Sequence, residues 1–392
     1  MTQPPPLRVG ILAAGAHPVQ TIYLPALNAL PTLYTIVAIH TPEPSSPSLN
    51  DILASPSITL ILNFMPNEYH ELYTIAALKA GKHVMVETPL SLSIPSAKRI
   101  LYAEREAPNG ARVFVASARR YAPCFESVFK REVSRLERIH YARLRMIAGP
   151  HVAHTATAAA ANTTSIEARP GRDGQSHKPE NGFGAAGKTS TILSSEDQTS
   201  RLQSLMEEVF GKDEQPNRER IALSRFLASL GCHDLGLMRD TLGYPDAVSN
   251  ICINEPFYSA LFHYNGDGSQ GGYPFTLMYE TGTDGVPRCD AQLAVYGQSK
   301  TVTIHYDLPY ARGQPLRVVV ETADERGGLK QTETVSTWEE AYQEELKALY
   351  AYLVEGREAK TAARDSLQDI RLFQTIFEQY DRQCGTIRTP LG

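Results

Sequence analysis

Hydrophobic positions in the first 120 residues occur as short apolar runs separated by amphipathic stretches. The runs at residues 7–12, 34–40, 58–62, 82–86 and 112–116 predict five buried strands. Between them, apolar side chains spaced for one helix face predict helices over about 22–30, 49–53, 69–80 and 94–106. Strands that alternate with helices at this spacing indicate a doubly wound parallel sheet.

A turn of small residues joins the first strand to the first helix. Such a turn lets backbone N–H groups approach a pyrophosphate, and the helix N-terminus adds a favourable dipole. Of the pattern G-x-G-x-x-G only Gly15 is present, because Ala13 and Pro18 replace the outer glycines. The stretch therefore fits a nucleotide cradle, and it also fits an ordinary buried strand and turn.

The second half of the chain has a different pattern. Residues 218–242 predict one helix closed by Gly243, and residues 248–335 alternate as in a half-solvated antiparallel sheet. Two amphipathic helices follow at about 337–382, with Thr337 and Glu340 predicted as a capping box and Ser366 as the second cap. The segment at about 150–218 is rich in small and polar residues, which predicts either a plain, partly disordered insertion or a lid over a site.

Composition limits the classes of protein to which the chain can belong. The 392 residues are 42% hydrophobic and 21% charged, with a net charge of −5, as in a soluble globular protein. The absence of a long basic run argues against a nucleic-acid partner, and no apolar stretch reaches the length of a membrane span. Five scattered cysteines without a secretion signal predict free thiols in the cytoplasm, and the histidine spacing suggests no metal site.

The segment MPNEYHELYTIAALKAGKHVMVETPLSLS resembles the glucose–fructose oxidoreductase / inositol dehydrogenase (Gfo/Idh/MocA) family. That family shows P-N-x-x-H, then A-L-x-A-G-K-H-V, then E-K-P, and residues 119–125 are similar to its next motif. Residues 229–243 resemble its second-domain helix, which carries D-x-x-x-H. The resemblance implies an N-terminal Rossmann domain over 7–123. It also implies an α+β domain over 124–392 with a large, mostly antiparallel open sheet.

The resemblance also implies hydride exchange between a nicotinamide and an alcohol or carbonyl group. In the family a Lys and an Asp/His pair orient the substrate hydroxyl and handle its proton. Here Thr88 stands at the Lys position and Ser229 at the Asp position, so His233 is the remaining group that titrates near neutral pH. Ser229 and His233 are spaced to share one helix face. Tyr121 is a fourth candidate catalytic residue by position.

Candidate contacts to NAD or NADP follow from the same resemblance and from the strand ends, and the sequence does not decide between the two cofactors. They are Ala13, Gly15, Ala16, His17, His40, Thr41, Met65, Pro66, Asn67, His70, Glu87, Thr88 and Arg120.

Three functions are compatible with these observations. The first is an NAD(P)-dependent oxidoreductase acting on a sugar-like small molecule or a specialised metabolite, with an altered acid/base set. The second is a non-redox isomerase, lyase or cyclase of the same fold, and the third is a catalytically silent nucleotide-binding sensor. The family resemblance further predicts a homodimer or higher homo-oligomer formed through the C-terminal sheet.

Overall fold

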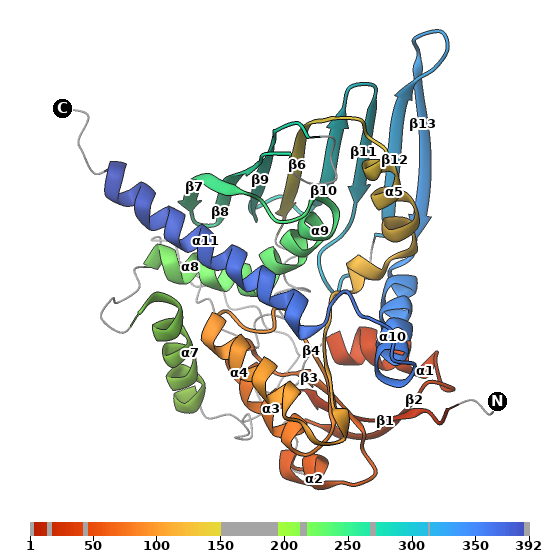
Figure 1. The fold of residues 1–392 in the computed structure, drawn as a ribbon, viewed down its shortest axis with the longest axis vertical. Helices are drawn as coiled ribbons and strands as arrows, with labels where there is room; N and C mark the ends of the chain where they lie inside the picture. The colour runs from red at the N-terminus through yellow and green to blue at the C-terminus, as the bar shows by residue number, and fades with distance from the viewer. Residues whose placement is uncertain are drawn as a thin grey trace, which may run out of the picture.

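The computed structural model of the protein describes residues 4–13, 18–41, 46–149, 195–211, 218–266, 272–312 and 314–387. Within these ranges the chain forms a parallel sheet enclosed by helices and a second, larger sheet (Figure 1).

The first sheet has five strands in the order β2-β1-β3-β4-β5, and all its pairs are parallel. The strands are β1 (Leu7–Ala13), β2 (Tyr34–His40), β3 (Leu60–Phe64), β4 (His83–Val86) and β5 (Val113–Val115). The connecting helices are α1 (Leu24–Asn28), α2 (Leu49–Ala54), α3 (Asn67–Lys79) and α4 (Ile94–Arg105). The doubly wound parallel sheet predicted from the hydrophobic runs is confirmed.

Alternate side chains of these strands enter two different cores. Leu60 and Leu62 of β3 join one buried cluster, whereas Ile61 between them joins the other. Successive strand residues point to opposite faces, so both faces of the sheet must be covered. One face packs against α2, α3, α4 and the start of α11 (Ala363–Ile387), and the other against α1 and α10 (Trp338–Val354).

The second sheet has eight strands in the order β13-β12-β11-β10-β6-β9-β8-β7. Its strands are β6 (Ile139–Ala148), β7 (Ala247–Asn254), β8 (Phe257–Tyr264), β9 (Phe275–Thr283), β10 (Cys289–Gly297), β11 (Lys300–His305), β12 (Leu316–Ala323) and β13 (Leu329–Ser336). Its pairs are antiparallel except β6 with β9. The predicted large, mostly antiparallel sheet is confirmed.

The predicted helix over 218–242 is interrupted. It consists of α8 (Arg218–Phe226), a wider π-helical turn over Leu227–Gly231, and α9 (Cys232–Leu242). A π-helical turn often lies at a functional site, because the extra residue re-aims the side chains that follow it. The turn here immediately precedes His233.

The described part of the segment predicted at about 150–218 as an insertion or a lid contains a helix that the sequence analysis did not predict. Ser195–Phe210 forms the helix α7, which lies against the outer side of the first domain (Figure 1). Glu208 accepts hydrogen bonds from Ser93 (2.6 Å) and Arg99 (2.8 Å), and the Tyr69 hydroxyl donates to Asp197 (2.8 Å). These contacts hold α7 on α3 and α4. Residues 150–194 and 212–217 lie outside the described residues.

The helix α10 begins with the predicted capping box. The Thr337 hydroxyl accepts from the Glu340 amide (3.2 Å), and the Glu340 carboxylate accepts from the Thr337 amide (2.8 Å). The Ser366 cap is wrong, because α11 already begins at Ala363 and Ser366 is buried inside it. All five cysteines are free.

Candidate active site

A hollow of about 510 Å³, including the space at its open mouth, lies where the two sheets meet. From the first domain it is lined by Tyr23, Glu87 and residues 116–119, which follow β4 and β5. His233 of α9, the loop after β11 and the start of α10 complete the lining. Ligands of doubly wound sheets bind beyond the carboxyl ends of the strands, which is the position of this hollow.

His233 lines the hollow and is 8% exposed. Its ring meets the Tyr310 ring edge to face, with centroids 5.8 Å apart at 85°. Burial, together with the nearby Arg119 guanidinium, lowers the pKa of His233 to about 3. The expectation that His233 titrates near neutral pH is therefore corrected, because the imidazole is neutral throughout the physiological range.

Ser229 does not join His233 in the hollow. Its hydroxyl donates to the Arg225 carbonyl oxygen of its own helix (2.9 Å), and the residue is not among those that line the hollow. The predicted Ser229/His233 pair is not formed, because the serine lies within the π-helical turn and bonds back to the preceding turn.

Arg119 reaches the hollow, whereas Arg120 does not. Arg119 donates to the Asp234 carboxylate (3.0 Å), and its guanidinium carbon lies 4.5 Å from the centroid of the Tyr306 ring. Arg120 is buried in ion pairs with Asp240 (3.0 Å) and Asp365 (2.9 Å), so its prediction as a cofactor contact is wrong. The two arginines diverge because residues 118–121 form a 3₁₀ turn, which points neighbouring side chains in different directions.

Tyr121 also points away from the lining. Its hydroxyl lies 2.8 Å from the Thr361 hydroxyl, and its ring stacks on Phe114 with centroids 5.7 Å apart. It is not among the lining residues, so these contacts give it a packing role in place of the predicted catalytic one.

Glu87 and Thr88 stand at the end of β4, as the sequence indicates. The Thr88 amide donates to Glu87 Oε2 (2.9 Å), and the Tyr23 hydroxyl lies 3.3 Å from Glu87 Oε1. Burial raises the pKa of Glu87 to about 7. Glu87 thus places a carboxyl group that titrates near neutral pH in the same hollow as His233.

The loop between β3 and α3 and the first turn of α3 carry four predicted cofactor contacts. Met65 and Pro66 are buried, and the His70 ring nitrogens lie 2.9 Å from the carbonyl oxygens of Pro89 and Met65. Burial lowers the pKa of His70 to about 4, so this ring joins two loops and does not face a ligand.

Asn67, the first residue of α3, differs from these residues because one of its polar atoms has no partner. Its amide nitrogen donates to the Ala228 carbonyl oxygen (3.4 Å), but its buried side-chain oxygen has no hydrogen-bond partner in the described structure. A buried acceptor without a donor costs stability unless a ligand or water supplies one.

The remaining predicted contacts lie near the ends of β1 and β2. Ala13 ends β1, whereas Gly15, Ala16 and His17 lie outside the described residues. His40 is buried with Nδ1 2.8 Å from the Pro47 carbonyl oxygen, and the Thr41 amide donates to the Ser46 hydroxyl (3.2 Å). The geometry at the end of β2 decides neither NAD nor NADP.

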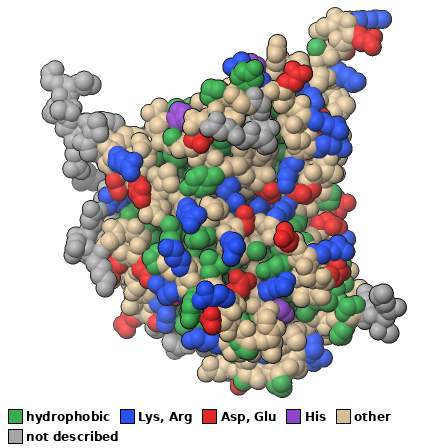
Figure 2. Space-filling view, viewed as in Figure 1, with side chains coloured by type: hydrophobic (Ala, Val, Ile, Leu, Met, Phe, Trp, Pro, Cys, Tyr) green, Lys and Arg blue, Asp and Glu red, His purple; other side chains and the backbone are tan. Residues whose placement is uncertain are grey.

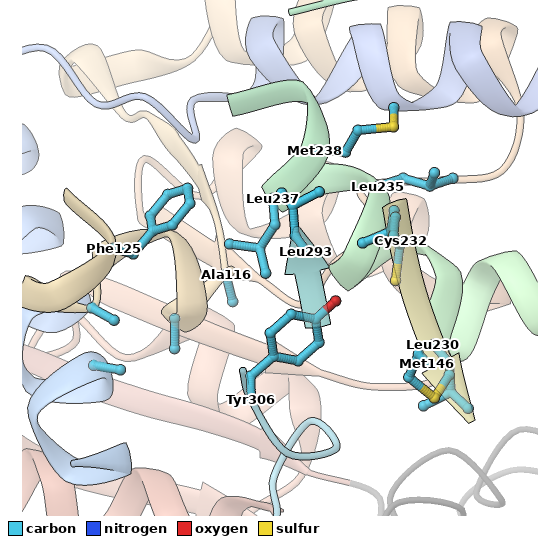
Figure 3. Close-up of a cluster of buried hydrophobic side chains, with 14 of the residues drawn as sticks. Ala116, Phe125, Met146, Leu230, Cys232, Leu235, Leu237, Met238, Leu293 and Tyr306 are labelled. Carbon is cyan, nitrogen blue, oxygen red and sulfur yellow. The ribbon is translucent and has the colours of Figure 1, made fainter. Parts of the chain in front are cut away.

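A polar group at the inner end of the hollow was missed in the sequence. The hydroxyls of Tyr306, Tyr279 and Thr281 and one oxygen of Asp234 are buried without a hydrogen-bond partner within the described ranges. The Tyr306 ring lies among the buried side chains of Ala116, Leu237 and Leu293 (Figure 3). The position of Asp234 directly after His233 was the available signal.

The loop after β11 holds Tyr310 against the site. Its backbone φ is 63°, in a region that bulky residues rarely adopt. The Tyr310 hydroxyl lowers the pKa of the neighbouring Glu87 carboxyl group, and its ring meets His233. Backbone strain of this kind is retained mainly where surrounding structure or function requires it.

Comparison with known proteins connects this geometry to a family. A family model described as an oxidoreductase family with an NAD-binding Rossmann fold, GFO_IDH_MocA, matches residues 9–117. Residues 9–117 therefore match the Rossmann domain of the Gfo/Idh/MocA family. The resemblance predicted from the P-N-x-x-H, A-G-K-H-V and E-T-P stretches is confirmed.

Relatives with curated sequences match short segments. A 1,5-anhydro-D-fructose reductase of Ensifer adhaerens is 35% identical over 60 residues, which is 15% of this chain and 18% of that protein. An uncharacterized oxidoreductase of Rhizobium meliloti is 33% identical over 82 residues, covering 21% and 24% of the two chains. These alignments cover less than a quarter of either relative.

Solved structures resemble the chain over nearly its whole length. An oxidoreductase of Thermotoga maritima has a TM-score of 0.61 at 15% identity, covering 95% of this chain and 96% of its own. A biliverdin reductase of Synechocystis, solved with biliverdin and NADP⁺, has a TM-score of 0.59 at 16% identity, covering 95% and 99%. At this level of identity the likeness establishes the shared two-part fold.

The described surface and helices add two observations. On the face seen in Figure 2, Lys and Arg side chains are interspersed with Asp and Glu. No helix in the described part of the chain is long and apolar enough to cross a membrane, and no group of three metal-ligating side chains occurs there.

Proposed function

We propose that the protein is an NAD(P)-dependent oxidoreductase that transfers hydride between a nicotinamide and an alcohol or carbonyl carbon of a small molecule. One observation carries the proposal. Glu87, from the end of a Rossmann strand, and His233, from the second domain, line the same hollow beyond the carboxyl ends of the sheet. This arrangement brings a nucleotide-binding edge and a substrate-facing helix together.

The residues present fit a nicotinamide nucleotide. Asn67 at the start of α3 has a buried oxygen without a donor, which a ribose hydroxyl would satisfy. Glu87, at the end of β4, is the second candidate contact. When bound, the nicotinamide supplies or accepts the hydride, and the chain supplies orientation and the proton.

Arg119, His233 and Tyr306 supply the polar part of substrate binding. The neutral imidazole can accept a hydrogen bond from a hydroxyl or donate one to a carbonyl oxygen. The unpartnered Tyr306 hydroxyl, the member of this polar group whose residue lines the hollow, favours a substrate with polar groups, as in a sugar-like molecule or a specialised metabolite. Apolar residues such as Leu308 and Leu316 cover the rest of the lining and exclude water.

Two observations favour the alternative functions. Thr88 carries no charge at the position of the family lysine, and Ser229 is turned away from the hollow. A non-redox enzyme of this fold or a silent nucleotide sensor would tolerate both. A cytoplasmic location and a homo-oligomer formed through the second sheet stay predictions.

Turnover separates these functions. We expect the full chain to oxidise NADH or NADPH in the presence of at least one member of a panel of small aldehydes, ketones and sugar-derived carbonyl compounds. The loss of nicotinamide absorbance, with reactions lacking enzyme or carbonyl as controls, measures it. Nucleotide binding without turnover on any compound would favour the sensor or the non-redox enzyme.

A further inference from the structure

The half-buried carboxyl group of Glu87 and the fully buried one of Glu345 meet at one phenol beside the hollow. The Tyr23 hydroxyl lies 3.3 Å from Glu87 Oε1 and 3.3 Å from Glu345 Oε2. Each carboxyl group also has a backbone donor on its other oxygen, since the Thr88 amide donates to Glu87 and the Ser117 amide to Glu345. The two carboxyl groups are therefore held in matching positions on either side of Tyr23.

The Tyr23 hydroxyl has one proton, which limits the hydrogen bonds that it can donate to the two carboxyl groups. A tyrosine hydroxyl donates one hydrogen bond, so it can serve only one of the two carboxylates as a donor. The second contact is favourable only when that carboxyl group carries a proton and donates to the phenol oxygen. The geometry therefore fits a pair of carboxyl groups that share at least one proton, as two like charges in one dry site do.

The surroundings favour the protonated form. Glu345 has no solvent exposure, and no described Lys or Arg forms an ion pair with it or with Glu87. Burial raises the pKa of Glu87 to about 7 and that of Glu345 to about 8, and the Glu87 carboxylate is a second cause of the raised pKa of Glu345. The titratable or charged groups that face the pair from the described elements around it are Tyr23, Tyr34, Tyr121, Cys232, Tyr310, Tyr342 and Lys360.

Lys360 is the nearest cation that acts on Glu345, but it is engaged elsewhere. Its ammonium group donates to the Arg120 carbonyl oxygen and to Glu126. It lowers the pKa of Glu345 less than burial and Glu87 raise it. The five tyrosines are neutral near pH 7, since burial raises the pKa of each.

We propose that Glu87 is the proton donor and acceptor of the site, and that Glu345 is a positioning residue that returns a proton to it through the Tyr23 hydroxyl. This inference rests on the proposed oxidoreductase function. Glu87 and Tyr23 line the hollow, whereas Glu345 lies behind Tyr23 and is not among the lining residues.

The proton transfer is balanced as follows. In the direction of reduction, the substrate carbonyl carbon gains a hydride from the reduced nicotinamide, and the carbonyl π bond breaks. The O–H bond of Glu87 breaks as its proton passes to the substrate oxygen, which becomes a hydroxyl and leaves Glu87 as a carboxylate. Tyr23 then gives its proton to Glu87 and takes one from Glu345. Once the product has left, the two transfers run in reverse to reprotonate Glu345, and Glu87, which lines the open hollow, takes a proton from solvent.

Thr88 is consistent with this assignment. A lysine in its place would set an ammonium group beside Glu87 and hold that carboxyl group ionised. A neutral threonine leaves the proton on the pair. His233, with a pKa of about 3, is neutral at pH 7 and is therefore a poor proton donor. It orients the substrate while Glu87 exchanges the proton.

Infrared spectroscopy of the full chain without nucleotide tests the shared proton directly. At about pH 6.5 an ordinary Glu is ionised, so we expect a protonated carboxylic acid band that Glu345→Gln loses in a difference spectrum. Glu344→Gln is the matched control, because Glu344 lies on the same helix, is 42% exposed and pairs with Lys347. Equal bands in wild type and Glu345→Gln would overturn the proposal.

Tyr23→Phe tests the bridge in a chain that keeps the aromatic ring. We expect its acid band to move in frequency, because the hydroxyl that bonds to both carboxyl groups is gone. An unmoved band would overturn the role of Tyr23 as the link between them.

The pH dependence of turnover then tests the use of the proton. For reduction, kcat/KM should fall about tenfold per pH unit above about pH 7–8, where the pair loses its proton. Glu345→Gln should move that fall by about one pH unit, and an unchanged profile would overturn the relay. If no nucleotide binds, the proposed function is wrong, but the infrared experiment still tests the shared proton independently.

Discussion

Arg120→Met should lower the free energy of unfolding by about 3 kcal/mol. Arg120 is 4% exposed and donates to Asp240 of α9, to Asp365 of α11 and to the Lys360 carbonyl oxygen. Methionine fills a similar volume but carries no charge, so each of the two carboxylates loses one of its cationic partners. Lys130 and Arg239 still pair with them, at 2.9 Å and 2.6 Å, which keeps the loss at the lower end of the usual range.

Urea unfolding of wild type, Arg120→Met and Arg105→Met measures this effect. Arg105 is 71% exposed and pairs with Glu106, which is 55% exposed, so its substitution should change stability by less than about 0.5 kcal/mol. Folded Arg120→Met should bind nucleotide as tightly as wild type. Weakened nucleotide binding at unchanged stability would instead restore the cofactor role that the sequence suggested for Arg120.

His233→Ala should lower kcat by about 100-fold and leave nucleotide affinity within about twofold of wild type. The reason is that His233 faces the hollow from the second domain, while the predicted nucleotide contacts lie on the first. Because burial and Arg119 hold its pKa near 3, its loss should lower the rate by the same factor from pH 5 to 9. His140→Ala, at an exposed histidine of β6, is the control.

The pH profile distinguishes two accounts of His233. If the histidine itself carried the proton, its removal would abolish a titration in the rate profile. Under the present account the profile keeps its shape in His233→Ala and changes in Glu345→Gln. A parallel loss of turnover and nucleotide affinity in His233→Ala would contradict the orienting role.

The fold was predictable because its elements have strong local patterns. The strand predicted at 34–40 has those bounds in the structure, and the helix predicted at 94–106 spans Ile94–Arg105. Helix α7 was missed because the whole region was judged by its composition. Its residues Leu202, Leu205, Met206 and Val209 do follow helical spacing.

The site was less predictable because its chemistry depends on tertiary packing. Sequence spacing placed Ser229 beside His233, but a π-helical turn and a backbone hydrogen bond separate them. The sequence also gave no means to tell which of Arg119 and Arg120 faces the hollow. Burial, which no residue specifies alone, moves the pKa of His233 down and that of Glu87 up.

Glu345 is one site residue that the sequence pattern could have indicated. It lies on the buried, apolar face of α10 with Tyr342 and Leu346, where an amphipathic helix usually carries a hydrophobic residue. A carboxyl group on a buried face indicates a polar partner in the core. That partner, Tyr23, is 322 residues away in the sequence.

The central claim is that the hollow beyond β4 and β5 binds a nicotinamide nucleotide. Titration of the full chain with NADH and with NADPH, followed by nicotinamide fluorescence, tests it most directly. We predict saturable binding of at least one of them. Binding should be about tenfold weaker in Asn67→Leu, because we expect the nucleotide to extend beyond the lining of the hollow to this unpartnered acceptor. Absence of binding for both nucleotides would contradict the account.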